Sequence, residues 1–265
     1  MAVQVPGSGG GGGGAPTQHF GSPAGTDWIV SMNDWTDNDV IGSGNQAGGF
    51  PHFLPDLTHS GTGSTDFQEN STTDTSIFGV HNFVMGSSTS AFGSLKTDLE
   101  SMNLGVGTWR VGNRVRFEAV PVSGAENYYW YTGFNSHANI LNTSNFAVLG
   151  ISLTDSATNF VVQTHGGSGE TVTDTGVAFA AGTWYNLEVE LTPTAVSAWI
   201  DGTLVLNAST SNVPTSATSF AMFPFVYQRV STFNVATRSF YLDWSYMAFK
   251  PGAARGSIGS GGPWG

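Results

Sequence analysis

The stretch from Thr175 to Leu206 limits the possible fold more than any other part of the sequence, because its apolar residues recur at every second position. From Tyr185 to Leu191 apolar and polar side chains alternate, which is the period of a β-strand with one buried and one solvated face. Pro193 interrupts the pattern, since proline has no N–H to donate to a ladder. A second alternating run ends at Asp201-Gly202, a pair that favours a tight hairpin turn. The stretch is therefore predicted to form consecutive antiparallel strands.

The composition extends this prediction to the whole chain. Only 10% of the 265 residues are charged and 36 are glycine, with Ser, Thr and Asn supplying much of the polar surface. Such a surface suits strands and turns better than helices, whose exposed faces favour Glu, Lys and Arg. The length fits one large β-sandwich. One segment, 92–102, has leucine and methionine spaced as in a short helix.

Period-two patterns predict further strands within 26–39, 76–85, 108–122, 128–131, 146–153, 159–164, 171–177, 220–230 and 238–249. Pro224 predicts a bulge or an edge position in its strand. In the last strand Phe240, Leu242, Trp244 and Tyr246 are expected on one face. The glycine- and proline-rich range 41–64 is expected to be a long loop.

Both ends of the chain differ from its middle. Residues 1–25 contain a run of glycines and are expected to form a linker or an extended arm, with Val3, Val5 and Pro6 available to dock on a neighbouring subunit. Residues 251–265 form a Gly/Ser-rich tail, and Trp264 is a candidate anchor into another chain. Residues 26–250 are predicted to be a single sandwich domain.

The order of several short motifs resembles a known superfamily. Gly182-Thr183-Trp184-Tyr185, the alternating strand, the break and Trp199-Ile200-Asp201-Gly202 are similar to the concanavalin A-like (laminin G-like) jelly rolls. Asn212-Val213-Pro214 and residues 238–249 extend the similarity, which covers about 159–249. Together they look like the lectin-like sandwich domains of structural proteins in tailed bacteriophages. The resemblance implies an all-β antiparallel jelly roll with an extended N-terminal arm and a C-terminal tail.

Charge and cysteine content exclude several classes of function. The net charge is −11 and there are only 8 Lys and Arg residues, so no nucleic-acid partner is expected. Arg110, Arg114 and Arg116 are the nearest approach to a basic cluster and are expected to lie on a solvated strand face. The absence of cysteine excludes disulfides and thiolate metal sites. The N-terminus lacks a signal-peptide pattern and no apolar run is long enough to span a membrane, so no membrane partner is expected.

The fold family includes glycoside hydrolases, which need carboxylates on one strand face. Glu188 and Glu190 are the nearest local match, but Thr192 or Pro193 stands where a third acid is required, so the two are expected to be solvent-facing. The six histidines form no metal-binding pair, and no nucleophile elbow is present. No enzyme is predicted, with a degenerate glycosidase as the remote alternative.

A sugar site is harder to exclude, because sugars stack on aromatic rings and hydrogen-bond to amides and carboxylates. The candidate ligand-binding residues are Tyr128, Trp130, Asn135, His137 and Trp199. The alternative to sugar binding is that each of these residues packs in the sandwich core or in a contact between subunits. No cofactor is expected, except that Asp243 falls where domains similar to this one often place a structural calcium ligand.

The function that this sequence favours is a non-enzymatic virion structural protein of a tailed phage, a head decoration or a tail component. It is expected to be made in the host cytoplasm and to bind other virion proteins. Family analogy also predicts a homo-oligomer, with a trimer as the expected state. A carbohydrate-binding module for host-surface glycans is the alternative.

Overall fold

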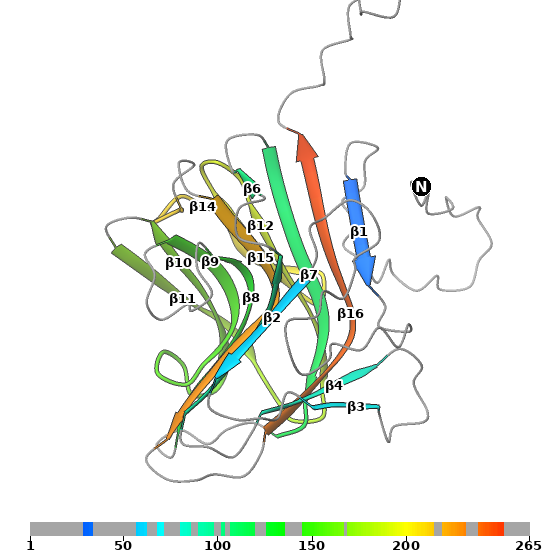
Figure 1. Ribbon diagram of the computed structural model, residues 1–265. Coiled ribbons are helices and arrows are strands. Elements are labelled where there is room, and N and C mark those ends of the chain that lie inside the picture. The colour runs from blue at the N-terminus through cyan, green and yellow to red at the C-terminus, as the bar shows by residue number, and fades with distance from the viewer. Residues whose placement is uncertain are drawn as a thin grey trace, which may run out of the picture.

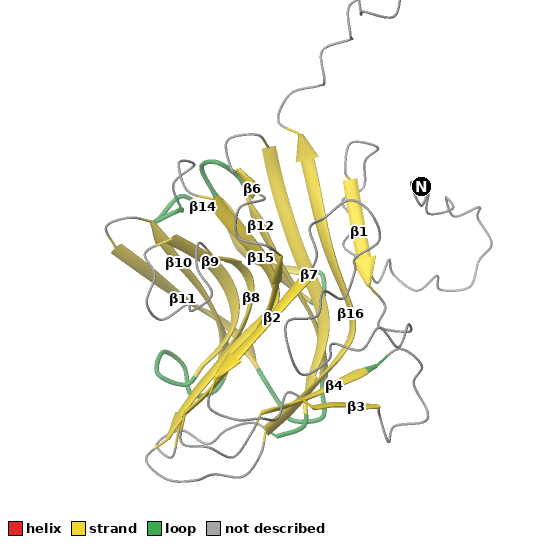
Figure 2. Cartoon of the chain, in the orientation of Figure 1, coloured by secondary structure: helices red, strands yellow, loops and turns green. Residues whose placement is uncertain are grey.

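The protein is seen in a computed structural model that describes residues 29–33, 57–62, 68–71, 80–85, 90–97, 102–103, 107–119, 126–135, 145–166, 169–214, 219–231 and 238–251. Every regular element within these ranges is a strand (Figure 2). The strands are β1 Ile29–Asn33, β2 Leu57–Thr62, β3 Gln68–Ser71, β4 His81–Met85, β5 Ser90–Thr97, β6 Met102–Asn103, β7 Gly107–Phe117, β8 Glu126–Asn135, β9 Asn145–Ser152, β10 Asn159–Gly166, β11 Gly169–Ala178, β12 Trp184–Leu191, β13 Val196–Ile200, β14 Thr203–Ser209, β15 Ser219–Ser231 and β16 Arg238–Pro251.

Two antiparallel sheets form a sandwich (Figure 1). The first sheet has the order β14-β13-β12-β7-β16-β4-β3, and β1 also pairs with β16. The second has the order β11-β10-β9-β8-β15-β5-β2, and β6 also pairs with β15. Long-range neighbours such as β7 with β16 and β8 with β15 make this a jelly roll, so the predicted fold class is confirmed.

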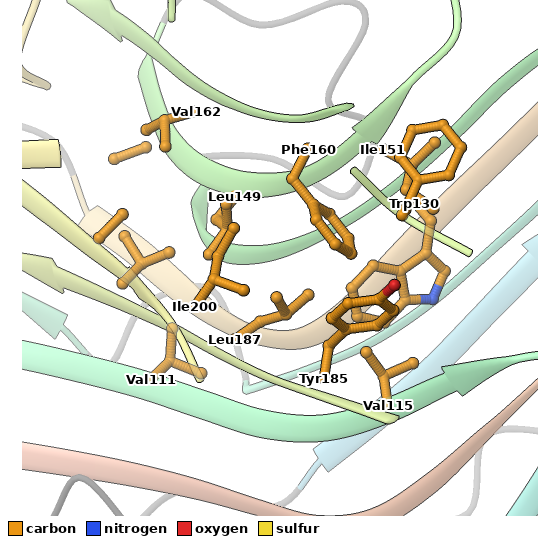
Figure 3. Packing of buried hydrophobic residues seen from close by; sticks show 14 of the residues in the cluster. Val111, Val115, Trp130, Leu149, Ile151, Phe160, Val162, Tyr185, Leu187 and Ile200 are labelled. Atoms are coloured by element: carbon orange, nitrogen blue, oxygen red, sulfur yellow. The ribbon is translucent and has the colours of Figure 1, made fainter. Parts of the chain in front are cut away.

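The core lies between the sheets and takes every second residue from each. Val111, Val115 and Leu187 of the first sheet face Leu149 and Phe160 of the second, and none of them is exposed (Figure 3). Aromatic rings also pack in this layer, and Phe117 with Trp130 and Phe160 with Tyr185 meet edge to face, a geometry that the ring quadrupoles prefer. Burial of these side chains is the main term that stabilises the fold.

The meander predicted between Thr175 and Leu206 is confirmed. The inward residues of β12 and β13 are all buried: Tyr185, Leu187, Val189, Leu191, Val196, Ala198 and Ile200. Asp201 and Gly202 both have positive φ, 49° and 76°, as the tight turn between β13 and β14 requires. The bulge predicted at Pro224 is also confirmed, since the pairing of β15 with β8 shifts register between Phe223 and Val226.

The helix predicted over 92–102 is wrong. The segment instead contains β5 and β6, and β5 pairs with β2 on one side and β15 on the other. Its backbone groups are therefore used in two ladders, which outweighs a weak helical spacing interrupted by Gly93 and Ser94. The 41–64 range, predicted to be a loop, likewise contains β2.

The predicted phase of the last strand is correct only for its first half. Phe240 and Leu242 point into the core, but the register against β7 shifts between Leu242 and Trp244. This bulge at Asp243 turns Trp244 and Tyr246 to the outer face and brings Ser245 and Met247 inward. A bulge adds one residue to one strand only, so strict alternation cannot reveal it.

The terminal segments 1–25 and 252–265, with Val3, Val5, Pro6 and Trp264, lie outside the described residues. Within the described ranges, no helix is long and apolar enough to cross a bilayer.

Candidate functional site

The sequence-predicted sugar platform does not exist as a surface. Tyr128 and Trp130 are 2% and 0% exposed and belong to the core between the sheets, so the core alternative describes them. Asn135 is fully buried on the opposite side of β8. His137 lies outside the described residues. Of the four candidates that the structure describes, only Trp199 is half-exposed, on the outer face of the first sheet.

Trp199 is part of a charged network on that outer face. The register of β7, β12 and β13 places Arg110 opposite Glu190 and Trp199 opposite Glu188. The Arg110 guanidinium lies 4.2 Å from the centre of the Trp199 ring, within the range of a cation–π interaction. It donates to Glu190 from Nη2 at 2.9 Å and from Nε at 3.2 Å, and to Glu188 from Nη1 at 3.4 Å.

Glu188 is the buried centre of this network, contrary to the expectation of a solvent-facing glutamate. It is 5% exposed and accepts a 2.7 Å hydrogen bond from the hydroxyl of Tyr246. Gly112 makes this possible, because a Cβ there would lie 2.5 Å from Cε1 of the Tyr246 ring. Burial raises the pKa of Tyr246 well above its usual range, and the Glu188 carboxylate adds to the rise.

The network has the chemistry of a structural ion pair rather than of a hydrolytic centre. Both carboxylates already accept hydrogen bonds from Arg110, and the third acid of a glycosidase pattern is missing from the sequence. Retaining hydrolysis needs a carboxyl that is free to donate a proton. Glu188 and Glu190 are instead both paired with Arg110.

The other arginines of β7 continue the pattern toward the far end of the strand. Arg114 donates to Asp243 at 2.7 Å and lies 5.0 Å from the Trp184 ring. Arg116 lies 4.4 Å from the Tyr241 ring. The predicted calcium ligand Asp243 is thus partnered by a cation, and the described residues hold no group of three or more His, Cys, Asp or Glu suited to a metal. The three arginines are half-buried and each lies over an aromatic ring, so the face is only partly solvated.

The outer face of the second sheet carries a polar cluster that no sequence pattern predicted. We call Tyr129, Ser152, Thr154, Asp155 and Gln163 the Asp155 cluster. Thr154 donates to the Tyr129 hydroxyl at 3.2 Å, and Gln163 donates to the Asp155 carboxylate at 2.6 Å. Ser152 also donates to that carboxylate. Asp155 and Thr154 are exposed and Tyr129 is half-exposed, whereas Ser152 and Gln163 are buried.

The local backbone explains how these side chains meet. The β9–β10 turn folds back across its own hairpin, because Asp155 reaches Gln163 in the middle of β10. Val161, on the same outer face, is fully buried. Gly150 lets β9 approach β8 closely, since a Cβ there would overlap the carbonyl oxygen of Trp130. In Figure 1 β8 and β9 bend visibly along their length. The sequence predicts a turn that closes a hairpin. It does not predict that this turn folds back over the hairpin.

Tyr131 stands behind the cluster on the same face and is 1% exposed. Burial raises the pKa of its hydroxyl well above the usual range, and the charge of Asp155 adds to the rise. Ser152 is close to this oxygen, yet no described group meets the geometry of a hydrogen bond to it. The cluster therefore combines an oriented carboxylate, an aromatic ring and a neutral phenol.

Comparison with solved structures supports the fold. The chain is similar to the crystal structure of SO2946, a protein of unknown function from Shewanella oneidensis MR-1, with 19% identity, a TM-score of 0.55, and coverage of 88% of this chain and 91% of that one. Two weaker similarities are to botulinum neurotoxin type C, in a structure about its interaction with two ganglioside molecules (12% identity, TM-score 0.47, 85% and 48% coverage), and to a Bacillus licheniformis β-glucanase (12%, 0.39, 65% and 78%). Likenesses this distant carry no argument about function.

Among curated proteins, no sequence matches this chain. A family model does match, described as SO2946-like, C-terminal domain, over residues 76–243. The matched range runs from just before β4 to Asp243 in β16 and includes the Asp155 cluster and, except for Tyr246, the network around Arg110. Since this range is more than half of the sequence, the chain belongs to the family of SO2946-like C-terminal domains.

Proposed function

We propose that the protein is a non-enzymatic carbohydrate-binding domain and that the Asp155 cluster is its sugar contact. The observation that carries the proposal is the position of Asp155: the residue is exposed, yet two buried donors, Ser152 and Gln163, hold its carboxylate in place. An exposed carboxylate that is already oriented loses little side-chain entropy when it accepts hydrogen bonds from a ligand.

The rest of the cluster suits the same ligand. A sugar presents an apolar C–H face and a rim of hydroxyl donors. The Tyr129 ring, whose hydroxyl accepts a hydrogen bond from Thr154, offers a half-exposed π surface for the C–H face. Asp155 offers acceptor oxygens for the sugar hydroxyls, and the exposed Thr154 adds a hydroxyl of its own.

Affinity electrophoresis of the full chain against a panel of neutral polysaccharides, followed by calorimetry on any that retard it, tests the proposal. Tyr129→Ala and Asp155→Asn are each expected to weaken binding about tenfold or more, the equivalent of ~1.4 kcal/mol. Tyr241→Ala is the matched control, because Tyr241 is a half-exposed aromatic residue on the outer face of the other sheet. Loss of binding in Trp199→Ala with Tyr129→Ala unaffected would refute this location of the site.

A role in particle assembly is a second proposal, supported by the sequence alone: the glycine-rich segment 1–25, the tail with Trp264, and the lack of cysteine suit a cytoplasmically made virion protein that docks on its neighbours. Light scattering after size-exclusion chromatography is expected to give a homo-oligomer, with a trimer as the predicted state. Deletion of residues 1–25 is expected to reduce attachment to the particle. A monomer at micromolar concentration, together with unchanged attachment, would contradict the proposal.

A further inference from the structure

The outer face of β10 and β11 beside the Asp155 cluster carries carboxylates and no Lys or Arg. Glu170 and Asp174 of β11 are exposed and lie on the same side as Gln163 and Val161 of β10. No Lys or Arg occurs anywhere in the sequence between Arg116 and Arg229, so strands β8 to β11 contain no permanent cation. His165, opposite Glu170, is the one titratable base on this face of the two strands, and Asp155 and Asp174 are not paired with it in the register.

Hydrogen bonds from neighbouring groups stabilise the charged form of Asp174. The N–H of Gly176 donates to its carboxylate at 2.7 Å, and the amide of Asn159 donates at 2.9 Å. These hydrogen bonds, the Gly176 one above all, hold the pKa of Asp174 below its usual value. Ser156, next to Asp155, bonds to the same carboxylate at 3.1 Å, so the two aspartates flank one turn.

A second observation makes this more than a group of acids. The hydroxyl of Tyr131 is buried, and although Ser152 is close to it, no described residue makes a hydrogen bond of acceptable geometry to it. A buried donor without an acceptor is costly and uncommon in folded proteins, and functional sites are where such groups concentrate. A ligand oxygen that reaches it would satisfy it.

We infer that the Asp155 cluster selects sugars by charge: it prefers sugars with a free, positively charged amino group over their uncharged N-acetylated forms, and it disfavours sugar acids. The inference rests on the proposed carbohydrate-binding function and adds the class of ligand. The ammonium group binds beside Asp155 and Asp174, while the carboxylate of a uronic acid is repelled by both. A unit charge about 6 Å from one carboxylate at a solvated surface changes affinity about three- to tenfold.

The test is calorimetry of the full chain at pH 6 with three oligosaccharides of equal length, made of glucosamine, N-acetylglucosamine and glucuronic acid. Affinity is expected to fall in that order, with about three- to tenfold between the first two. In 0.5 M NaCl the ratio should fall toward one, since screening shortens the reach of surface charges. Asp155→Asn should reduce the ratio in the same way at low salt.

Glu190→Gln is the matched control, because it removes one negative charge from the opposite sheet and should leave the ratio unchanged. Tyr131→Phe supplies a readout that a merely structural hydroxyl would not give: affinity for the amino sugar falls although thermal stability does not. Equal affinity for all three oligomers, or tighter binding of the acidic one, overturns the inference and leaves the carbohydrate-binding function standing. No binding of any sugar overturns both.

Discussion

Replacing Arg110 by alanine should destabilise the protein far more than replacing its neighbour Arg114. The Arg110 side chain is 13% exposed and that of Glu188 6%, so the substitution leaves a buried carboxylate that has lost its cation. Removing one partner of such a pair costs about 3–5 kcal/mol. The lower end applies here, because Tyr246 still donates to Glu188, and Glu190 is 20% exposed and can be reached by water. Loss of the stacking on Trp199 adds roughly 0.5–1 kcal/mol.

Arg114 is the control for this prediction because it lies on the same strand, faces the same way and also pairs with an acid. Its side chain is 33% exposed and that of Asp243 20%, and such exposed pairs contribute only about 0–1 kcal/mol. Urea unfolding followed by tryptophan fluorescence should therefore show about 3.5–4 kcal/mol of lost stability for Arg110→Ala and about 1 kcal/mol for Arg114→Ala. Equal losses in the two variants would refute the assignment of Glu188 as a buried, cation-dependent carboxylate.

Three further predictions follow from burial and close contact. Trp130→Ala should cost about 3–5 kcal/mol of stability, because the indole is fully buried. Calorimetric unfolding measures this loss, and a fully stable variant with altered sugar binding would contradict the assignment of Trp130 to the core. Gly150→Ala should lose more than about 3 kcal/mol of stability or fail to fold, since the new Cβ would overlap the backbone of β8. Gly176→Ala should lose only about 1 kcal/mol, because the space around it is open and only its φ of 71° is unfavourable. Equal losses in the two variants, measured by urea unfolding, would contradict the close approach of β8 and β9. Tyr131 and Tyr246 have raised pKa values, so their contribution to stability is intact below pH ~10 and is lost as the pH rises above it. Absorbance at 295 nm should show that at least two of the seven tyrosines ionise only when the protein unfolds. Ionisation of all seven in a protein that is still folded would contradict this.

The fold was predictable because alternation and turn chemistry are local. Tyr185 to Leu191 and Asp201-Gly202 specify a strand and a turn within a few residues of themselves, and the structure confirms both. The helix predicted over 92–102 was wrong because the pairing of β5 with β2 and β15 is set by residues far away in the sequence. The bulge at Asp243 was invisible for a related reason, since it depends on the register of β16 against β7.

The candidate sites were predicted less well than the fold. Alternation says which side chains share a face, but it does not say whether that face is covered, so Tyr128 and Trp130 looked like an aromatic surface and are core. Glu188 was placed on the polar phase correctly, yet its burial follows from Arg110 and Tyr246, which come from two other strands. Asp155 looked like an ordinary turn residue, because its hydrogen bond to Gln163 appears only when the turn folds back over the hairpin.

A crystal structure of the full chain soaked with a glucosamine oligomer tests whether a sugar binds to the outer face of the second sheet, at the Asp155 cluster. We expect a sugar ring against Tyr129, with a hydroxyl or ammonium group within about 3.2 Å of an Asp155 carboxylate oxygen, the usual hydrogen-bond limit. A sugar bound instead beside Trp199 on the first sheet, or an empty cluster at millimolar ligand with binding seen in solution, would contradict it.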